Sequence, residues 1–289
     1  MIVIGPIDGF SEELAKNLSA NFIELDRRIF PDKEVCPRIV LDKDIKNEHV
    51  VLVNRINRPL NPNRYLVEYL LTIKNLKELG AKEIDVVMPY FVYARQDKVF
   101  RRGEPLSTNY VLELLKEAGA TRFFSISVHF QKKEGKFPAP MPAFNISGFV
   151  SIADYLKTLN LKNPIIIGPD KKSGDFAKQI ADILQCESTY LEKERDLDTG
   201  AIETKTELDV SGKDVVIVDD IAASGTTLIN AIENLKNSER VICTVVHPIL
   251  TDECLEKVSS KAKFIACNTI ESPISKISVT ERIAKFVKQ

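Results

Sequence analysis

The sequence predicts an α/β protein with two similar domains, each built on a mainly parallel sheet flanked by helices. Two observations carry this prediction. Short apolar runs alternate with segments of helical periodicity along the whole chain, which is typical of parallel sheets with helical connections. A Pro-rich stretch without periodicity, 136–143, interrupts the alternation and is typical of a linker. We therefore expect a first domain over 1–141 and a second over 142–275, with 276–289 forming a final helix that packs on the first.

The predicted elements of the first half follow from these patterns. Apolar runs predict strands, and apolar residues at helical spacing predict helices. Gly80 and Gly119 follow the second and third helices, as is common at a helix C-terminus. The strands are expected at 2–4, 22–25, 49–53, 84–88 and 123–128, and the helices at 11–18, 63–79 and 107–118.

The second half repeats the plan without a strict sequence repeat. Strands are expected at 165–167, 215–218, 241–246 and 264–267, a helix follows residue 227, and 279–287 forms an amphipathic helix.

Composition and charge exclude several classes of protein. The chain has 289 residues, of which 44% are hydrophobic, enough for two ordinary domain cores. With 40 basic and 41 acidic residues the formal net charge is −1, so no global field favours nucleic acid or an anionic membrane. Five widely spaced cysteines without a C-x-x-C pair suit reduced thiols. Without a basic leader or a membrane-length apolar run, we expect a cytoplasmic protein.

The stretch 214–235 joins an apolar run to a helical pattern through acidic and small residues. Asp219 and Asp220 end the run, where two carboxylates can accept hydrogen bonds from neighbouring hydroxyls, as on a ribose ring. Small residues then let the backbone close around an anion at the positive end of the following helix. A sugar-phosphate site is therefore predicted, although such residues also end strands and cap helices in many proteins. The small residues are Ala223, Ser224, Gly225, Thr226 and Thr227.

Other candidate residues follow predicted strands, where ligands gather in parallel sheets. Arg95 and Gln96 follow the strand at 84–88, His129 follows 123–128, Asp170 follows 165–167, and His247 follows 241–246. Each one alone fits an ordinary surface or cap residue. As a set they indicate a cleft.

Two loops carry further candidates. Lys193 and Arg195 lie two positions apart in a highly charged run, so in extended backbone both would project on one face and could clamp a polyphosphate. In the first domain Phe30 could stack on a base, while Asp32 and Glu34 could accept hydrogen bonds from an exocyclic amine.

These motifs, in this order, closely resemble the ribose-phosphate diphosphokinase (PRPP synthetase) family. The segment 219–227 alone resembles the phosphoribosyl diphosphate loop of the type I phosphoribosyltransferase fold, which also serves phosphoribosyltransferases. The segments 30–34, 93–97, 168–170 and 193–195, together with His129, extend the resemblance along almost the whole chain. It implies two domains of that fold, with ATP on the N-terminal side and ribose 5-phosphate on the C-terminal side.

The resemblance also implies residue roles. Lys193 and Arg195 would be catalytic, and His129 and Asp170 would contact Mg²⁺. Phe30, Asp32, Glu34, Arg95, Gln96 and His129 would bind ATP. Arg195, Asp219, Asp220, Ala223, Ser224, Gly225, Thr226 and Thr227 would bind ribose 5-phosphate. A homo-oligomer, at least a dimer with shared ATP sites, would follow.

Two alternatives remain open from sequence. A phosphoribosyltransferase would consume PRPP at the same site but would not need the Phe30 loop or the paired Lys193 and Arg195. A catalytically silent regulatory relative would be expected to have damaged motifs. This chain departs from the family pattern mainly at Lys33, where Gly is usual, and at Lys171 and Lys172.

Overall fold

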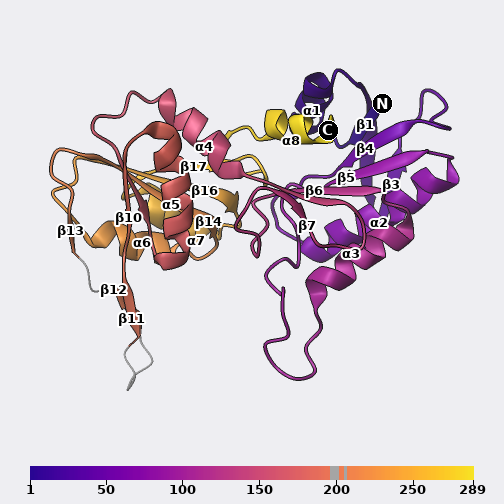
Figure 1. The fold of residues 1–289 in the computed structure, drawn as a ribbon. Helices are drawn as coiled ribbons and strands as arrows, with labels where there is room; N and C mark the ends of the chain where they lie inside the picture. The colour runs from indigo at the N-terminus through magenta and orange to yellow at the C-terminus, as the bar shows by residue number, and fades with distance from the viewer. Residues whose placement is uncertain (196–201, 205–206) are drawn as a thin grey trace. The chain divides into compact units, whose positions relative to one another are not determined.

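The computed structural model describes residues 1–195, 202–204 and 207–289, with backbone only for 193–195 and 202–204. The chain forms two compact units (Figure 1). The first comprises Met1–Ser147 with Val279–Gln289, and the second comprises Gly148–Ser278.

The first unit is built on a mainly parallel sheet. Its central strands are all parallel, while β3 and β7 pair antiparallel to their neighbours at the two edges. In spatial order the strands are β3 (Val35–Ile39), β2 (Asn21–Ile29), β1 (Ile2–Gly5), β4 (His49–Val53), β5 (Glu83–Val87), β6 (Arg122–Ile126), β8 (Ala143–Ile146) and β7 (Gly135–Phe137).

Helices cover both faces of this sheet. On one face α1 (Phe10–Leu18) packs against α8 (Thr280–Val287), and on the other α2 (Pro62–Glu78) packs against α3 (Ser107–Ala118) (Figure 1). Asn61 begins α2 by accepting the N–H of Arg64 at 3.1 Å, with Pro62 at the first helical position. Gly80 has φ 84° just after α2, a left-handed conformation that suits glycine and stops the helix.

The stretch predicted as a linker belongs to this sheet instead. Within 135–146, β7 and β8 form an antiparallel pair, and β8 also pairs in parallel with β6. The prolines lie in the turn between the two strands, where no ladder hydrogen bond is required of them. The prolines of this stretch therefore belong to a turn between two strands and not to a linker between domains.

The second unit has a parallel sheet of its own. Its helices again form two layers: α4 (Gly148–Lys157) packs against α5 (Lys171–Leu184), and α6 (Thr226–Glu233) against α7 (Asp252–Ser259). In spatial order the strands are β10 (Glu187–Tyr190), β9 (Ile165–Gly168), β14 (Asp214–Ala222), β16 (Arg240–Pro248), β17 (Lys263–Cys267) and β18 (Ser275–Ile277).

Two smaller pairs complete the second unit. The antiparallel strands β11 (Lys193–Arg195) and β12 (Ile202–Thr204) extend from its body (Figure 1). The short parallel strands β13 (Leu208–Asp209) and β15 (Leu235–Lys236) pair beside it.

Buried apolar side chains from neighbouring strands fill both cores. Leu52, Val86 and Phe123 belong to the core of the first unit, and Ile217 and Val245 to that of the second. The predicted α/β class with mainly parallel sheets and flanking helices is confirmed. Across the described residues, no helix combines the length and apolar character needed to cross a bilayer.

Candidate active site

Each unit has one point where the chain reverses its direction across the sheet. In the first unit β1 and β4 are neighbours, but α1 leads from β1 toward one edge and α2 leads from β4 toward the other. In the second unit β9 and β14 are likewise neighbours: α5 leads from β9 toward one edge, and α6 leads from β14 toward the other. A crevice opens at the carboxyl ends of such strand pairs, and ligands of α/β proteins bind there.

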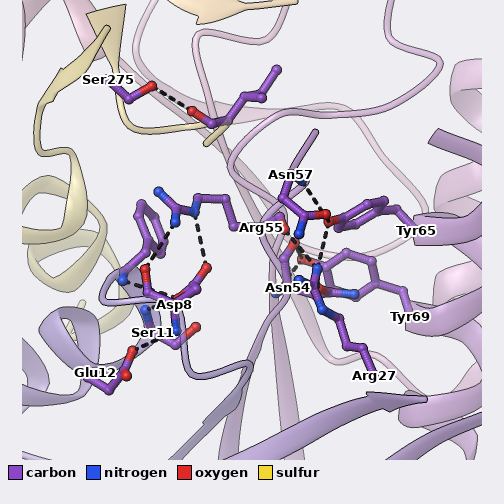
Figure 2. Close-up of polar contacts among 12 residues, drawn as sticks. Asp8, Ser11, Glu12, Arg27, Asn54, Arg55, Asn57, Tyr65, Tyr69 and Ser275 are labelled. Carbon is purple, nitrogen blue, oxygen red and sulfur yellow. Dashed lines mark hydrogen bonds and ion pairs between the residues drawn. The ribbon is translucent and has the colours of Figure 1, made fainter. Parts of the chain in front are cut away.

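The protein's own side chains fill this position in the first unit (Figure 2). Arg55 donates from Nε to Asp8 Oδ2 and from Nη2 to the Asp8 carbonyl, both at 3.0 Å, and both side chains are less than 10% exposed. Asp8 Oδ1 also accepts the N–H groups of Phe10 and Ser11 at the start of α1. A carboxylate already occupies the helix end that could otherwise hold an anion.

A second polar group lies beside this ion pair (Figure 2). Arg27 donates from Nη1 to Tyr65 Oη at 2.6 Å and to Asn54 Oδ1 at 3.2 Å. The crevice of the second unit is consequently the better candidate for a sugar phosphate.

In the second unit three carboxylates gather at the crevice. Asp170 follows β9 and caps α5, while Asp219 and Asp220 lie near the carboxyl end of β14. The buried Ser173 Oγ lies 3.0 Å from Asp170 Oδ1 and 2.9 Å from Asp219 Oδ1. Sequence reasoning predicted the three acids but missed Ser173, whose only sequence clue is its position three residues after a capping aspartate.

The electrostatics of this group favour a proton on Asp219. Burial, and then the negative charge of Asp220, raise the pKa of Asp219 to about 7. The hydrogen bond that Ser173 donates to Asp219 acts in the opposite direction and lowers this pKa, but burial and Asp220 outweigh it. Lys172 partly balances the charge, with Nζ 3.6 Å from Asp220 Oδ2.

The backbone after β14 forms a cradle over residues 223–227. Gly225 has φ 78°, a left-handed conformation that turns the chain into α6. Among the described residues no side chain caps α6, and Ser224 and Thr226 are exposed with their hydroxyl oxygens 3.2 Å apart. An uncapped helix N-terminus bordered by hydroxyls can bind a phosphate.

The first unit carries the candidates for the nucleotide. Phe30 lies in the turn between β2 and β3 and is 43% exposed, with its N–H donated to the Glu34 carbonyl at 2.8 Å. Asp32 Oδ1 accepts the N–H of Glu34 at 3.1 Å. Lys33 has φ 78°, in the left-handed region that favours glycine.

Further candidates follow the neighbouring strands β5 and β6. Gln96 Nε2 donates to Glu104 Oε2 at 3.2 Å, and that oxygen also accepts the N–H groups of Phe100 and Arg101. Arg95 is exposed on this loop, and the half-buried His129 follows β6. Because β5 and β6 are adjacent and parallel, these segments leave the same edge of the sheet.

The remaining candidates have mixed outcomes. The backbone of Lys193 and Arg195 lies in β11, but their side chains are outside the described residues. His247 does not follow its strand as predicted: β16 continues to Pro248, and the buried His247 Nδ1 lies 3.0 Å from Thr269 Oγ1. It is a core residue of the sheet.

A divalent cation fits the acidic crevice chemically. Within the described part of the chain, no cluster of three or more His, Cys, Asp or Glu forms a preassembled metal site. Mg²⁺ does not require one, because it usually takes one or two carboxylates, several waters and substrate phosphates. Burial first, and the negative charge of Asp220 second, raise the pKa of Asp219, and a bound cation would favour the ionised carboxylate against both.

Comparison with known proteins identifies the family. Residues 6–119 match the N-terminal domain of ribose phosphate pyrophosphokinase, and 142–281 match the phosphoribosyl transferase domain. A ribose-phosphate pyrophosphokinase of Methanobrevibacter smithii is 34% identical over 290 residues, covering 95% of each chain. The chain belongs to the ribose-phosphate pyrophosphokinase family. The relative from Methanothermobacter thermautotrophicus is 36% identical and covers 91% of each chain.

The fold agrees with the family assignment. A crystal structure of phosphoribosylpyrophosphate synthetase from Mycobacterium smegmatis superposes with a TM-score of 0.81 at 22% identity, covering 99% of this chain and 97% of that one. The predicted family and the predicted two-domain fold class are thereby confirmed.

Proposed function

We propose that this chain transfers the β,γ-diphosphoryl group of Mg-ATP to O1 of ribose 5-phosphate, giving PRPP and AMP. Membership of the ribose-phosphate pyrophosphokinase family supports this reaction. The structural observation that carries it is the crevice of the second unit, where an acidic pair on β14 precedes an uncapped helix N-terminus.

The crevice suits both ends of ribose 5-phosphate. Asp219 and Asp220 would accept hydrogen bonds from the ring hydroxyls, and the backbone N–H groups of 223–227 would hold the 5-phosphate. The hydroxyls of Ser224, Thr226 and Thr227 would add donors. Binding both ends orients the anomeric hydroxyl for attack.

The nucleotide would be held mainly by the first unit. Phe30 would stack on the adenine, with Asp32 and Glu34 accepting hydrogen bonds from its amine. Arg95, Gln96 and His129 would contact the rest of ATP. Exposure of Phe30 and Arg95 supports these roles, because both side chains remain available to a ligand.

Catalysis would rest on charge stabilisation by Lys193 and Arg195. Negative charge spreads over the transferring group in the transition state, so fixed cations there lower the barrier. Mg²⁺, held through His129, Asp170 and the ATP phosphates, would supply further charge neutralisation.

The proposal includes an oligomeric assembly and a cytoplasmic location. We expect a homo-oligomer, at least a dimer, in which the Phe30 loop of one chain completes the ATP site of another. The near-zero net charge and the reduced cysteines support a cytoplasmic enzyme that binds neither nucleic acid nor membranes.

One incubation separates this reaction from its rivals. With ATP, Mg²⁺ and ribose 5-phosphate, AMP and PRPP should form in equal amounts, because the attack falls on the β-phosphorus. Accumulation of ADP with a singly phosphorylated sugar would indicate an ordinary kinase. A phosphoribosyltransferase would consume added PRPP in the presence of a nucleobase, and a silent regulator would form no product.

A further inference from the structure

The first turn of α7 is bound directly to the sugar-phosphate cradle. Thr251 caps α7 by accepting the N–H of Cys254 at 3.1 Å through Oγ1. Its own N–H donates to the carbonyl of Ala223 at 3.2 Å. One residue thereby begins the helix and fixes the first residue of the cradle.

The side chains of the same helix set the space beneath Gly225. A Cβ added at Gly225 would lie 2.6 Å from Cys254 Sγ and 3.2 Å from Val258 Cγ2. Cys254 and Val258 are fully buried, so neither can move aside into solvent. The left-handed turn of Gly225 therefore rests on the sulfur of Cys254.

The sulfur of Cys254 acts on Gly225 through its size. Cys254 is fully buried beside Cys243, whose pKa is raised to about 12 by burial and then by Cys254. A buried neutral thiol behaves as a small apolar group and is inert. What it supplies to Gly225 is a contact of fixed volume.

We propose that Cys254 is a positioning residue for the sugar-phosphate site: its side chain sets the depth of the Gly225 turn and so aims the first N–H groups of α6 at the 5-phosphate. This inference rests on the proposed function of the cradle. A side chain that is too large would push Gly225 outward, and one that is too small would leave the turn unsupported.

Cys254→Val tests the proposal, with Cys267→Val as its matched control. Cys267 is also fully buried in the second unit, but it lies on β17 with Sγ 3.7 Å from the Gly148 carbonyl. Cys254→Val should raise KM for ribose 5-phosphate about tenfold, or about 1.4 kcal/mol, with KM for ATP changed by less than about twofold. Cys267→Val should leave both KM values near those of the wild type.

Two further variants, Cys254→Ser and Cys254→Ala, keep the test decisive. Cys254→Ser keeps a γ atom beneath Gly225 but is smaller and buries a hydroxyl, so its KM for ribose 5-phosphate should lie between those of the wild type and Cys254→Val. Cys254→Ala should instead speed hydrogen exchange at the backbone amides of 223–227, even if Cys254→Val does not fold. An unchanged KM in Cys254→Val, or an equal rise in Cys267→Val, would overturn the proposal.

The exchange measurement also separates the two proposals. If the wild type forms no AMP, the proposed function fails, while exchange at 223–227 still decides whether Cys254 supports the cradle. Exchange in Cys254→Ala that matches the wild type at those amides would refute the positioning role whatever the enzyme catalyses.

Discussion

At the scale of single residues, Ser173 links two carboxylates that have different proposed roles. Its hydroxyl lies within 3.0 Å of both Asp170 and Asp219, in a crevice where burial and Asp220 raise the pKa of Asp219 to about 7. An uncharged Asp219 is a poorer hydrogen-bond acceptor for a sugar than a carboxylate. Substrate binding and proton release are therefore expected to be coupled here.

The raised pKa predicts a specific dependence of stability on pH. Because folded Asp219 holds its proton more tightly than the unfolded chain, the free energy of unfolding should fall as pH rises from about 4 to about 7 and then level off. The contribution is at most about 1.4 kcal/mol per pH unit. Asp219→Asn removes this contribution. Over this pH range, the urea midpoint of the variant should therefore rise relative to that of the wild type as the pH increases. Parallel curves would contradict the assignment.

Lys193→Ala gives a second prediction at this scale. If its charge is matched to the transition state, kcat should fall about 10²–10³-fold with little change in KM. Steady-state kinetics would check this, with Lys178→Ala as the control, since Lys178 is an exposed lysine paired with Asp182 on α5. A loss of less than about threefold would show that Lys193 is an ordinary surface residue.

Candidate site residues could be predicted from sequence where a short local pattern marks them. The acidic pair on β14 and the glycine after it follow from residue type and spacing. Ser173 could not be predicted as a link, because its contact with Asp219 joins residues 46 positions apart. His247 was misplaced for the opposite reason: a polar residue after an apolar run suggested a strand end, but Thr269 satisfies it inside the sheet.

At the scale of elements, buried strands were the most predictable part of the fold. The segments 2–4 of β1, 50–53 of β4 and 215–218 of β14 are continuously apolar because helices cover both faces of the sheet. Edge strands were missed, since one side of their backbone is free and their composition is mixed. β3 contains Pro37, and β10 is largely exposed.

A polar network joins the last helix to the sheet within the first unit, at the amino ends of the strands. Asp85 on β5 is fully buried and accepts hydrogen bonds from His49 at 2.7 Å and from Arg122 at 2.6 and 2.9 Å. Arg122 also donates to the carbonyl of Val287 at 3.0 Å. Burial opposes ionisation of Asp85, but the His49 and Arg122 hydrogen bonds outweigh it and hold its pKa below the ordinary value.

Asp85→Ala should therefore destabilise the protein by about 3 kcal/mol, because it leaves Arg122 partly buried without its carboxylate. The loss should be largest near neutral pH. The ionised Asp85 stabilises the fold at pH values above the ordinary pKa of an aspartate, and this stabilisation disappears as the pH falls through the lowered pKa of the folded state. Urea denaturation would measure it. Glu281→Ala is the control, because Glu281 forms an exposed pair with Lys285 on α8 and its loss should cost less than about 1 kcal/mol. Equal losses would show that the Asp85 network contributes no special stability.

At the scale of the whole molecule, the two units share a plan but differ at their crevices. In the first, the ion pair of Arg55 with Asp8 fills the position, and in the second an acidic group remains beside an uncapped helix. The nucleotide candidates of the first unit, such as Phe30, lie in loops at other strand ends. This difference supports the proposal that the first unit binds the nucleotide and the second unit binds ribose 5-phosphate.

The last prediction concerns how chains combine. If the Phe30 loop of one chain completes the ATP site of another, Asp32 and Lys193 of a given site belong to different chains. Asp32→Ala and Lys193→Ala, each folded and nearly inactive alone, should then rescue one another on co-expression. With random assortment half of the dimers are mixed, and half of the sites in a mixed dimer carry neither lesion, so activity should approach roughly a quarter of the wild type. Circular dichroism of each single variant is the control for folding. Co-expressed protein no more active than the better single variant would mean that each chain builds its own site.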